Sequence, residues 1–160
     1  MTVTDTIARL GLELPAAPDL PAGFEMPFRM VRKIGSRAVI SGHVPLKSDG
    51  ALWPHLGKVG DAISVEEAER AARQVVLTML ASLNAELGSL DRIEHWVRLF
   101  GMVNAAPGFT ELSRVINGGS NVLIEVFGPD IGAHARSAIG VAELPFDAPV
   151  EMEGELIVRD

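Results

Sequence analysis

The chain has 160 residues, of which 48% are hydrophobic and 22% are charged, with no cysteine and a net charge of −7. This length and composition are those of one globular domain, and the lack of cysteine excludes disulfides, thiolate metal ligands and cysteine nucleophiles. The acidic balance disfavours nucleic acid as a partner, because such binding rests on clustered positive charge. No apolar run approaches the ~20 residues of a membrane span and no signal peptide is visible, so we expect a cytoplasmic protein without membrane contact.

The N-terminal segment is expected to form a short helix and an arm. Residues 1–12 predict an amphipathic helix with Ile7 and Leu10 on one side. Residues 14–23 carry three prolines, which lack a backbone donor and favour extended neighbours. We therefore divide the chain into an N-terminal helix with a proline-rich arm, residues 1–23, and an α+β domain, residues 24–160.

A β-hairpin is predicted next, because strand-like runs at 28–34 and 37–44 flank the turn Gly35-Ser36. Its basic residues are interpreted as edge charges, with anion binding as the alternative; they are Arg29, Arg32, Lys33 and Arg37. Residues 51–63 have no clear period and predict a loop, whose Trp53 and His55 are expected to be packing or surface residues rather than ligands.

The clearest local signal is a long helix that begins after Ser64 and ends at Gly88. Ser64 and Glu67 have the spacing of a reciprocal capping box, and glycine is the usual residue just beyond a helix C-terminus. Apolar residues recur every three or four positions, which indicates a broad face that a sheet must cover. These residues are Val65, Ala68, Ala72, Val75, Val76, Met79, Leu80, Leu83 and Leu87.

A strand over 92–103 and a second helix over about 109–127 follow. The strand alternates in a way that suits burial on one face, with His95 as a structural residue. Gly118-Gly119 in the middle of the helix costs ~1 kcal/mol per glycine against alanine. Either the helix breaks there or another backbone comes very close.

Two closing strands are predicted, over 136–144 and 150–158. Arg136 begins the first, among residues that are otherwise small or apolar apart from Glu143. A guanidinium at the head of a buried-looking strand is costly unless an anion meets it, and its donor fork suits a carboxylate. In the second strand Glu151, Glu153 and Glu155 share one face, which is either solvated or borders a pocket with Arg136.

The element order is therefore β-β-α-β-α-β-β, an α+β fold in which two helices cover one face of a mixed sheet. No phosphate-binding loop, dinucleotide-binding glycine pattern, metalloprotease motif or nucleophile elbow is present. Neither a metal nor an organic cofactor is expected.

Three segments carry a resemblance to a known family. Arg136-Ser137 is followed by Leu144-Pro145, with Glu151-Met152-Glu153 at the expected distance. The segments Val39–Pro45 and Met26–Phe28 supply the second and third anchors. The chain resembles the RidA/YjgF family, also described as the endoribonuclease L-PSP or reactive-intermediate deaminase family, over about residues 24–159.

The resemblance implies a chorismate-mutase-like fold assembled as a homotrimer, with three sites at the clefts between subunits. It implies that Arg136 holds the carboxylate of an imine derived from an amino acid while water adds and ammonia leaves, giving a 2-keto acid. Ser41 and Gly42 would line the pocket, and Glu151 would position water or a proton. The implied partner is a small carboxylate-bearing metabolite.

Some positions depart from the family pattern within that implied pocket. Phe28 replaces a tyrosine, His43 replaces a glutamine and Ala138 replaces a cysteine. Asn117 lies near, but out of register with, an asparagine that some members contribute from the second helix. Two other functions stay open: a non-catalytic trimeric binding module for small carboxylates, and the ribonuclease activity in the family's label, which the acidic balance disfavours.

Overall fold

A five-stranded mixed sheet forms the frame of the molecule in the computed structural model, which describes residues 1–17, 23 and 25–159. The strand order is β1-β2-β5-β3-β4, with β3 and β4 parallel and the other neighbours antiparallel. The strands are β1 (Val31–Ile34), β2 (Arg37–His43), β3 (Ile93–Asn104), β4 (Ala135–Val141) and β5 (Val150–Val158). The predicted order of strands and helices is confirmed.

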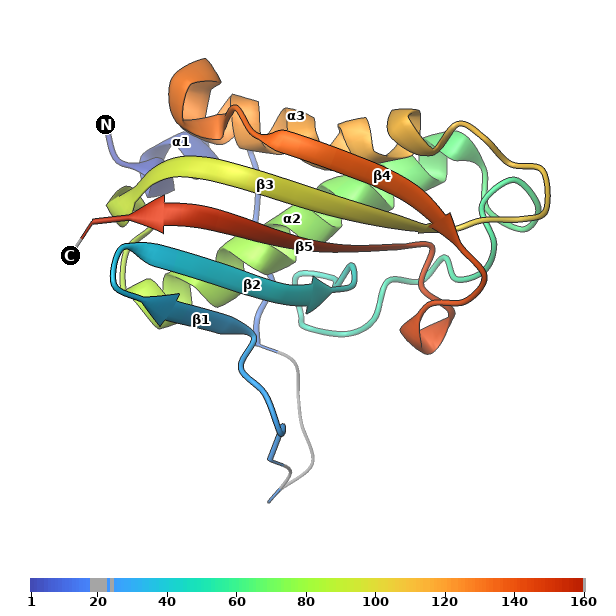
Figure 1. Cartoon of the computed structure of the whole chain (residues 1–160), viewed down its shortest axis with the longest axis horizontal. Helices are drawn as coiled ribbons and strands as arrows, with labels where there is room; N and C mark the ends of the chain where they lie inside the picture. Colours follow the sequence, from blue (N-terminus) through green and yellow to red (C-terminus); the bar gives the residue numbers. More distant parts are fainter. Residues whose placement is uncertain (18–22, 24, 160) are drawn as a thin grey trace.

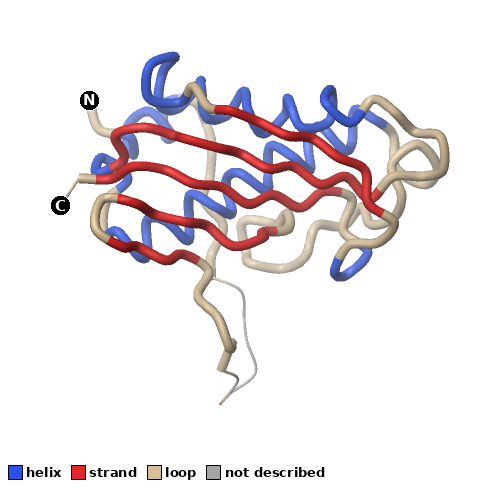
Figure 2. Tube along the Cα trace, in the orientation of Figure 1, coloured by secondary structure: helices blue, strands red, loops and turns tan. Residues whose placement is uncertain are grey.

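The two long helices, α2 (Val65–Leu87) and α3 (Leu112–Gly132), both lie on one face of this sheet (Figures 1 and 2). Their apolar faces and the inward residues of β5 form one core; those β5 residues are Val150, Met152, Leu156 and Val158. None of the described helices lies on the opposite face of the sheet (Figure 1). None of the described helices is both long and apolar enough to cross a membrane.

The short helix α1 (Val3–Arg9) belongs to the same core. Ile7 is buried there, and the backbone N–H of Val3 donates to the carboxylate of Asp91 at 2.7 Å. Asp91 lies in the short 3-10 helix η1 (Leu90–Arg92), and a second such turn, η2 (Pro145–Asp147), precedes β5. Of the predicted arm, residues 18–22 lie outside the described residues.

At the start of α2, one of the two hydrogen bonds of the predicted capping box is formed. The hydroxyl of Ser64 accepts from the backbone N–H of Glu67 at 3.2 Å, as the capping signal predicts. The Glu67 carboxylate, however, accepts from the Trp53 indole N–H at 3.2 Å and from Arg70. The reciprocal half of the predicted capping box is therefore replaced by a bond that fixes the loop over 51–63.

The simple alternation predicted for β3 is wrong at its N-terminal end. The pairing of β3 with β5 shifts between Ile93 and His95 and again between Trp96 and Arg98. Because each shift changes which side of the sheet a residue faces, Trp96 and Leu99 are both buried whereas His95 and Val97 are exposed. From Leu99 onward the alternation is regular.

The two glycines of α3 mark a close approach of helices rather than a break. A Cβ atom at Gly118 would lie 2.2 Å from the carbonyl oxygen of Glu69 on α2, and one at Gly119 would lie 2.8 Å from the Met152 methyl. The helix instead kinks further on, at Gly128, where φ is 78°. Its last turn then extends to Gly132, beyond the predicted end.

We expect Gly118→Ala to lower the free energy of unfolding by ~1–3 kcal/mol, because the added methyl group meets a backbone atom that cannot rotate away. This loss should exceed the ~1 kcal/mol that alanine gains in helix propensity. Urea titration followed by circular dichroism measures the change. Asn121→Ala, at an exposed position of the same helix, is the control and should change stability little; a Gly118→Ala protein more stable than the wild type would contradict the close approach.

Candidate functional site

Arg136 lies at the outer edge of the sheet and faces the helices. β4 pairs only with β3, and Arg136 is aligned with the buried Leu99. Within one chain the strand is not buried as its composition suggests, because none of the residues Ala135–Val141 is buried in this edge strand. Arg136 itself is half-buried, and Ala138 on the same face packs against the core.

The guanidinium of Arg136 is held by a polar stripe on α3. Its Nη1 atom donates to Asn117 Oδ1 at 2.8 Å and to Ser120 Oγ at 3.1 Å, and its Nη2 atom donates to the carbonyl oxygen of Ser113 at 3.4 Å. These three residues are spaced by four and three positions, so they share one helix face. All three acceptors are neutral, and among the described residues no carboxylate oxygen lies within 4 Å of Arg136.

His134 completes the group around Arg136. Its Nδ1 atom lies 2.7 Å from the carbonyl oxygen of Gly132, and its Nε2 atom lies 3.0 Å from Ser120 Oγ. The imidazole is half-buried. We call the set Asn117, Ser120, His134, Arg136 and Ala138 the arginine half-site.

Glu151 lies on the other face of the sheet, beside a bulge in β2. Ser41 and Gly42 stand opposite the single residue Glu153, because the pairing of β2 with β5 shifts between Ile40 and His43. The Glu151 carboxylate occupies the space above Gly42, where a Cβ atom would lie 1.9 Å from Oε1. A larger residue at position 42 would therefore displace the Glu151 carboxylate from its present place. We call Ser41, Gly42 and Glu151 the glutamate half-site.

The environment of Glu151 favours its neutral form. Partial burial raises the pKa of the Glu151 carboxyl, and the nearby negative charge of Glu153 adds to the shift. No described residue donates a hydrogen bond to this carboxylate. Glu155, by contrast, forms a two-point ion pair with Arg37, at 2.6 and 2.9 Å, and Glu153 is exposed.

His43 does not face Glu151. It is 2% exposed and points to the helix side, where Nδ1 lies 2.7 Å from the carbonyl oxygen of Ser41 and Nε2 lies 2.8 Å from Ser82 Oγ on α2. Burial lowers the pKa of the His43 imidazole, and the hydrogen bond to Ser41 only partly opposes this. The structure therefore gives His43 a buried, neutral role behind the bulge.

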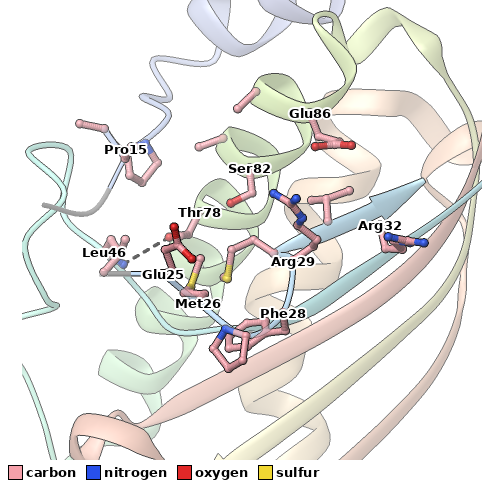
Figure 3. A pocket seen from close by; sticks show the side chains of 17 residues that line it. Pro15, Glu25, Met26, Phe28, Arg29, Arg32, Leu46, Thr78, Ser82 and Glu86 are labelled. Carbon is pink, nitrogen blue, oxygen red and sulfur yellow. Dashed lines mark hydrogen bonds between the residues drawn. The ribbon is translucent and has the colours of Figure 1, made fainter. Parts of the chain in front are cut away.

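Phe28 borders a groove of about 1200 Å³ between α2 and the segment that leads into β1 (Figure 3). Its side chain is half exposed. Thr78 and Ser82 of α2 line the groove, as do the methionines Met26 and Met30. Phe28 thus lies apart from the arginine half-site. Its segment contacts the glutamate half-site, because the Ser41 hydroxyl donates to the carbonyl oxygen of Arg29 at 2.7 Å and the Ser41 backbone N–H donates to that of Met30 at 2.9 Å.

Within one chain the two half-sites are on opposite faces of the sheet. Leu99 aligns with Arg136 and with Gly154, whereas Met102, three residues along the same strand, aligns with Glu151. An odd separation along a regular strand reverses the face. Arg136 and Glu151 are also two strands apart, roughly 10 Å at the usual spacing. One chain therefore cannot bring both groups to one small molecule.

The helix-free face around Glu151 is partly apolar. Val39 on β2, Val97 on β3 and Ile139 on β4 are each about 40% exposed there. Arg98 places its guanidinium 5.2 Å from the centre of the Phe100 ring on the same face. Such a mixed surface, apolar with interspersed charges, suits contact with another protein surface.

No group of three or more histidine, aspartate or glutamate side chains with metal-binding geometry occurs among the described residues. The polar groups of both half-sites are instead arginine, amide, hydroxyl, imidazole and a single carboxylate. This set can bind and orient an anion and move protons.

Comparison with known proteins identifies the family. Residues 5–150 match the family model described as "YjgF/chorismate_mutase-like, putative endoribonuclease", and the chain belongs to this family. Protein TCP17 of Trypanosoma cruzi is 39% identical over 151 residues, which cover 94% of this chain and 91% of that protein. The expected family membership and chorismate-mutase-like fold are thereby confirmed.

Two solved structures are similar over nearly the whole chain. The protein Atu1372 of Agrobacterium tumefaciens, described as of unknown function, is 32% identical with a TM-score of 0.86 and covers 98% of this chain and 92% of its own. A protein of Shewanella oneidensis MR-1, described as a "putative endoribonuclease", is 26% identical with a TM-score of 0.87. The match covers 99% of this chain and 100% of that protein.

Sequence reasoning singled out Arg136 but missed Ser120 and His134, and set Asn117 aside as out of register. A usable signal was present: Ser113, Asn117 and Ser120 form a polar stripe at helical spacing, and His134 and Arg136 are two residues apart at the head of a strand. The sequence does not reveal that this face of α3 packs against β4.

We expect Glu151→Gln to raise the melting temperature at pH 7.5. The raised pKa means that ionised Glu151 destabilises the folded state, and glutamine removes that charge. The gain should be present above the folded-state pKa and should disappear as the pH falls below the ordinary carboxyl range, where both states bind the proton.

Thermal unfolding between about pH 3 and pH 8 measures this difference. Glu94→Gln, at an exposed position of β3, is the matched control and is measured over the same pH range. A Glu151→Gln protein that is less stable than the wild type at pH 7.5 would show that the carboxylate is stabilised by a partner instead.

Proposed function

We propose that this protein hydrolyses reactive enamine or imine intermediates derived from amino acids to 2-keto acids and ammonia, at clefts between the subunits of a homotrimer. The proposal rests on the positive charge of Arg136, which no described residue neutralises. Its guanidinium is positioned by three neutral acceptors and has no described carboxylate within ion-pair distance. A substrate carboxylate supplies the missing negative charge.

The donor geometry of Arg136 supports this role. A guanidinium has five N–H groups, and three of them donate to Asn117, Ser120 and Ser113. Five minus three leaves two N–H groups for a ligand, as many as a carboxylate accepts from one edge of the fork. A charged hydrogen-bonded pair of this kind contributes ~1.5–3 kcal/mol to binding.

The need for a second chain follows from the opposite faces of Arg136 and Glu151. In the proposed trimer, the arginine half-site of one subunit meets the glutamate half-site of its neighbour. The exposed apolar residues Val39 and Ile139 support this, because assembly would remove them from water. In that cleft Ser41 and Gly42 line the wall beside Glu151, and Glu151 positions the water that adds to the imine carbon.

The chemistry asks only for binding, orientation and proton transfer, so neither metal nor organic cofactor is part of the proposal. Phe28 brings no hydroxyl to the substrate, which leaves the polar contacts to Arg136, Ser41 and Glu151. The alternative function, a trimeric module that binds a small carboxylate without turning it over, uses the same arginine and differs only in its rate.

We expect Arg136→Ala to abolish the enzyme's acceleration of keto-acid release. An amino-acid oxidase would generate the imine in situ, and a coupled dehydrogenase would follow keto acid formed above the spontaneous rate. Arg136→Lys keeps the charge but loses the planar fork, so it should retain only part of the activity. Arg9→Ala, on the exposed side of α1, is the control and should match the wild type.

Two outcomes bear on the alternative functions. A wild-type protein that leaves the spontaneous rate unchanged but binds 2-keto acids, with binding lost in Arg136→Ala, establishes the binding module. RNA degradation that is unaffected by Arg136→Ala sets the ribonuclease activity apart from this cleft.

Subunit complementation tests whether the site is shared. Arg136→Ala and Glu151→Gln should each be nearly inactive alone. When the two variants are coexpressed and mixed trimers form at random, one cleft in roughly four receives both native residues. About a quarter of the wild-type activity should therefore return, measured on the whole population of coexpressed trimers without removal of the parental ones. Mixed trimers as inactive as their parents would contradict a cleft that takes Arg136 and Glu151 from different chains.

A further inference from the structure

Ser120 and His134 have the hydrogen-bond geometry of a polarised hydroxyl. The carbonyl oxygen of Gly132, 2.7 Å from His134 Nδ1, can only accept, so Nδ1 carries the proton. In the neutral imidazole the Nε2 atom then has the free lone pair, and it lies 3.0 Å from Ser120 Oγ. The hydroxyl of Ser120 therefore donates its proton toward His134.

The same oxygen accepts a hydrogen bond from a cation. Arg136 Nη1 donates to Ser120 Oγ at 3.1 Å. Ser120 Oγ thus lies between a guanidinium, which stabilises negative charge on the oxygen, and an imidazole, which can take its proton. A hydroxyl, a base in hydrogen-bond contact and a third group that orients the base are the parts of a proton-transfer unit.

A second Ser–His pair in the protein shows what a purely structural version looks like. Ser82 and His43 repeat the pattern, with Nδ1 bonded to a carbonyl two residues earlier and Nε2 to a helix serine. His43, however, is 2% exposed, and no described arginine donates to Ser82. His134 is half-buried, and Ser120 Oγ links it to the arginine that binds substrate in the proposed function.

We propose that Ser120 and His134 form the proton relay of the arginine half-site. This inference rests on the proposed function and names the groups that move protons during it. Ser120 is the group that touches the attacking water, and His134 is the base behind it. Both come from the chain that supplies Arg136, whereas Glu151 comes from the neighbouring subunit.

The protons and electrons balance as follows for a protonated imine. The oxygen of water bonds to the imine carbon, the π electrons of the C=N bond move to nitrogen, and the water proton passes through Ser120 to His134. His134 returns this proton through Ser120 to the amine nitrogen. The new hydroxyl then loses its proton by the same route as the C=O bond forms, and ammonia leaves with the C–N electron pair and takes up that proton.

The test uses the intact oligomer with His134→Ala. We expect the rate of keto-acid release above the spontaneous rate to fall by ~10²-fold, as for loss of a general base. The affinity for 2-oxobutanoate, measured by calorimetry, should stay within about threefold, because Asn117, Ser120 and Ser113 still hold Arg136. Added imidazole should restore activity several-fold, since the site is half open. Ser120→Ala should lose rate in the same way but without rescue.

Other outcomes overturn the relay. A His134→Ala protein with wild-type activity would overturn the relay alone. So would a fall in rate matched by an equal fall in affinity without imidazole rescue, since His134 would then only position Arg136. His55→Ala, an exposed histidine on another loop, is the control and should keep full activity. An inactive wild-type protein would instead overturn the proposed function together with the relay.

Discussion

The alternation of side chains across one sheet governs where every candidate residue of this protein lies. Helices cover one face only, so each strand residue is either directed toward α2 and α3 or toward the bare face. Arg136 falls on the first side and Glu151 on the second. No rotamer change can bridge the sheet. A site that uses both groups therefore requires a second copy of the chain, and the bare face offers the apolar surface for it.

Arg136 illustrates how a charge is placed without being neutralised. An amide, a hydroxyl and a backbone carbonyl orient its guanidinium. Because all three groups are neutral, the positive charge of the guanidinium can still attract an anion. An intramolecular carboxylate would hold the side chain as well, but it would compete with a ligand for the same donors. On the opposite face of the sheet, burial has a different effect on Glu151. It raises the pKa of the Glu151 carboxyl and so favours the neutral form, which carries a proton.

The two Ser–His pairs show that the same local geometry serves different ends according to its surroundings. Ser82 and His43 are sealed between β2 and α2, where burial keeps the imidazole neutral and the bond fixes the bulge behind Ser41 and Gly42. Ser120 and His134 stand at an edge strand beside a cation. The pairs differ in their exposure to solvent and in the presence of the Arg136 guanidinium. Neither difference depends on the hydrogen bond between serine and histidine.

The sequence by itself determined the element order and the family, because periodicity, caps and motif spacing act over a few residues, and it singled out Arg136 and Glu151 as candidates. Only the tertiary structure decided that β4 is an edge strand, that two bulges redirect β3, and that His43 is buried while His134 stands beside Arg136. It also showed that the backbone of α2 packs closely against Gly118, where a side chain would not fit. These outcomes depend on which helix face docks on which strand, a contact between residues distant in the chain that no local pattern encodes.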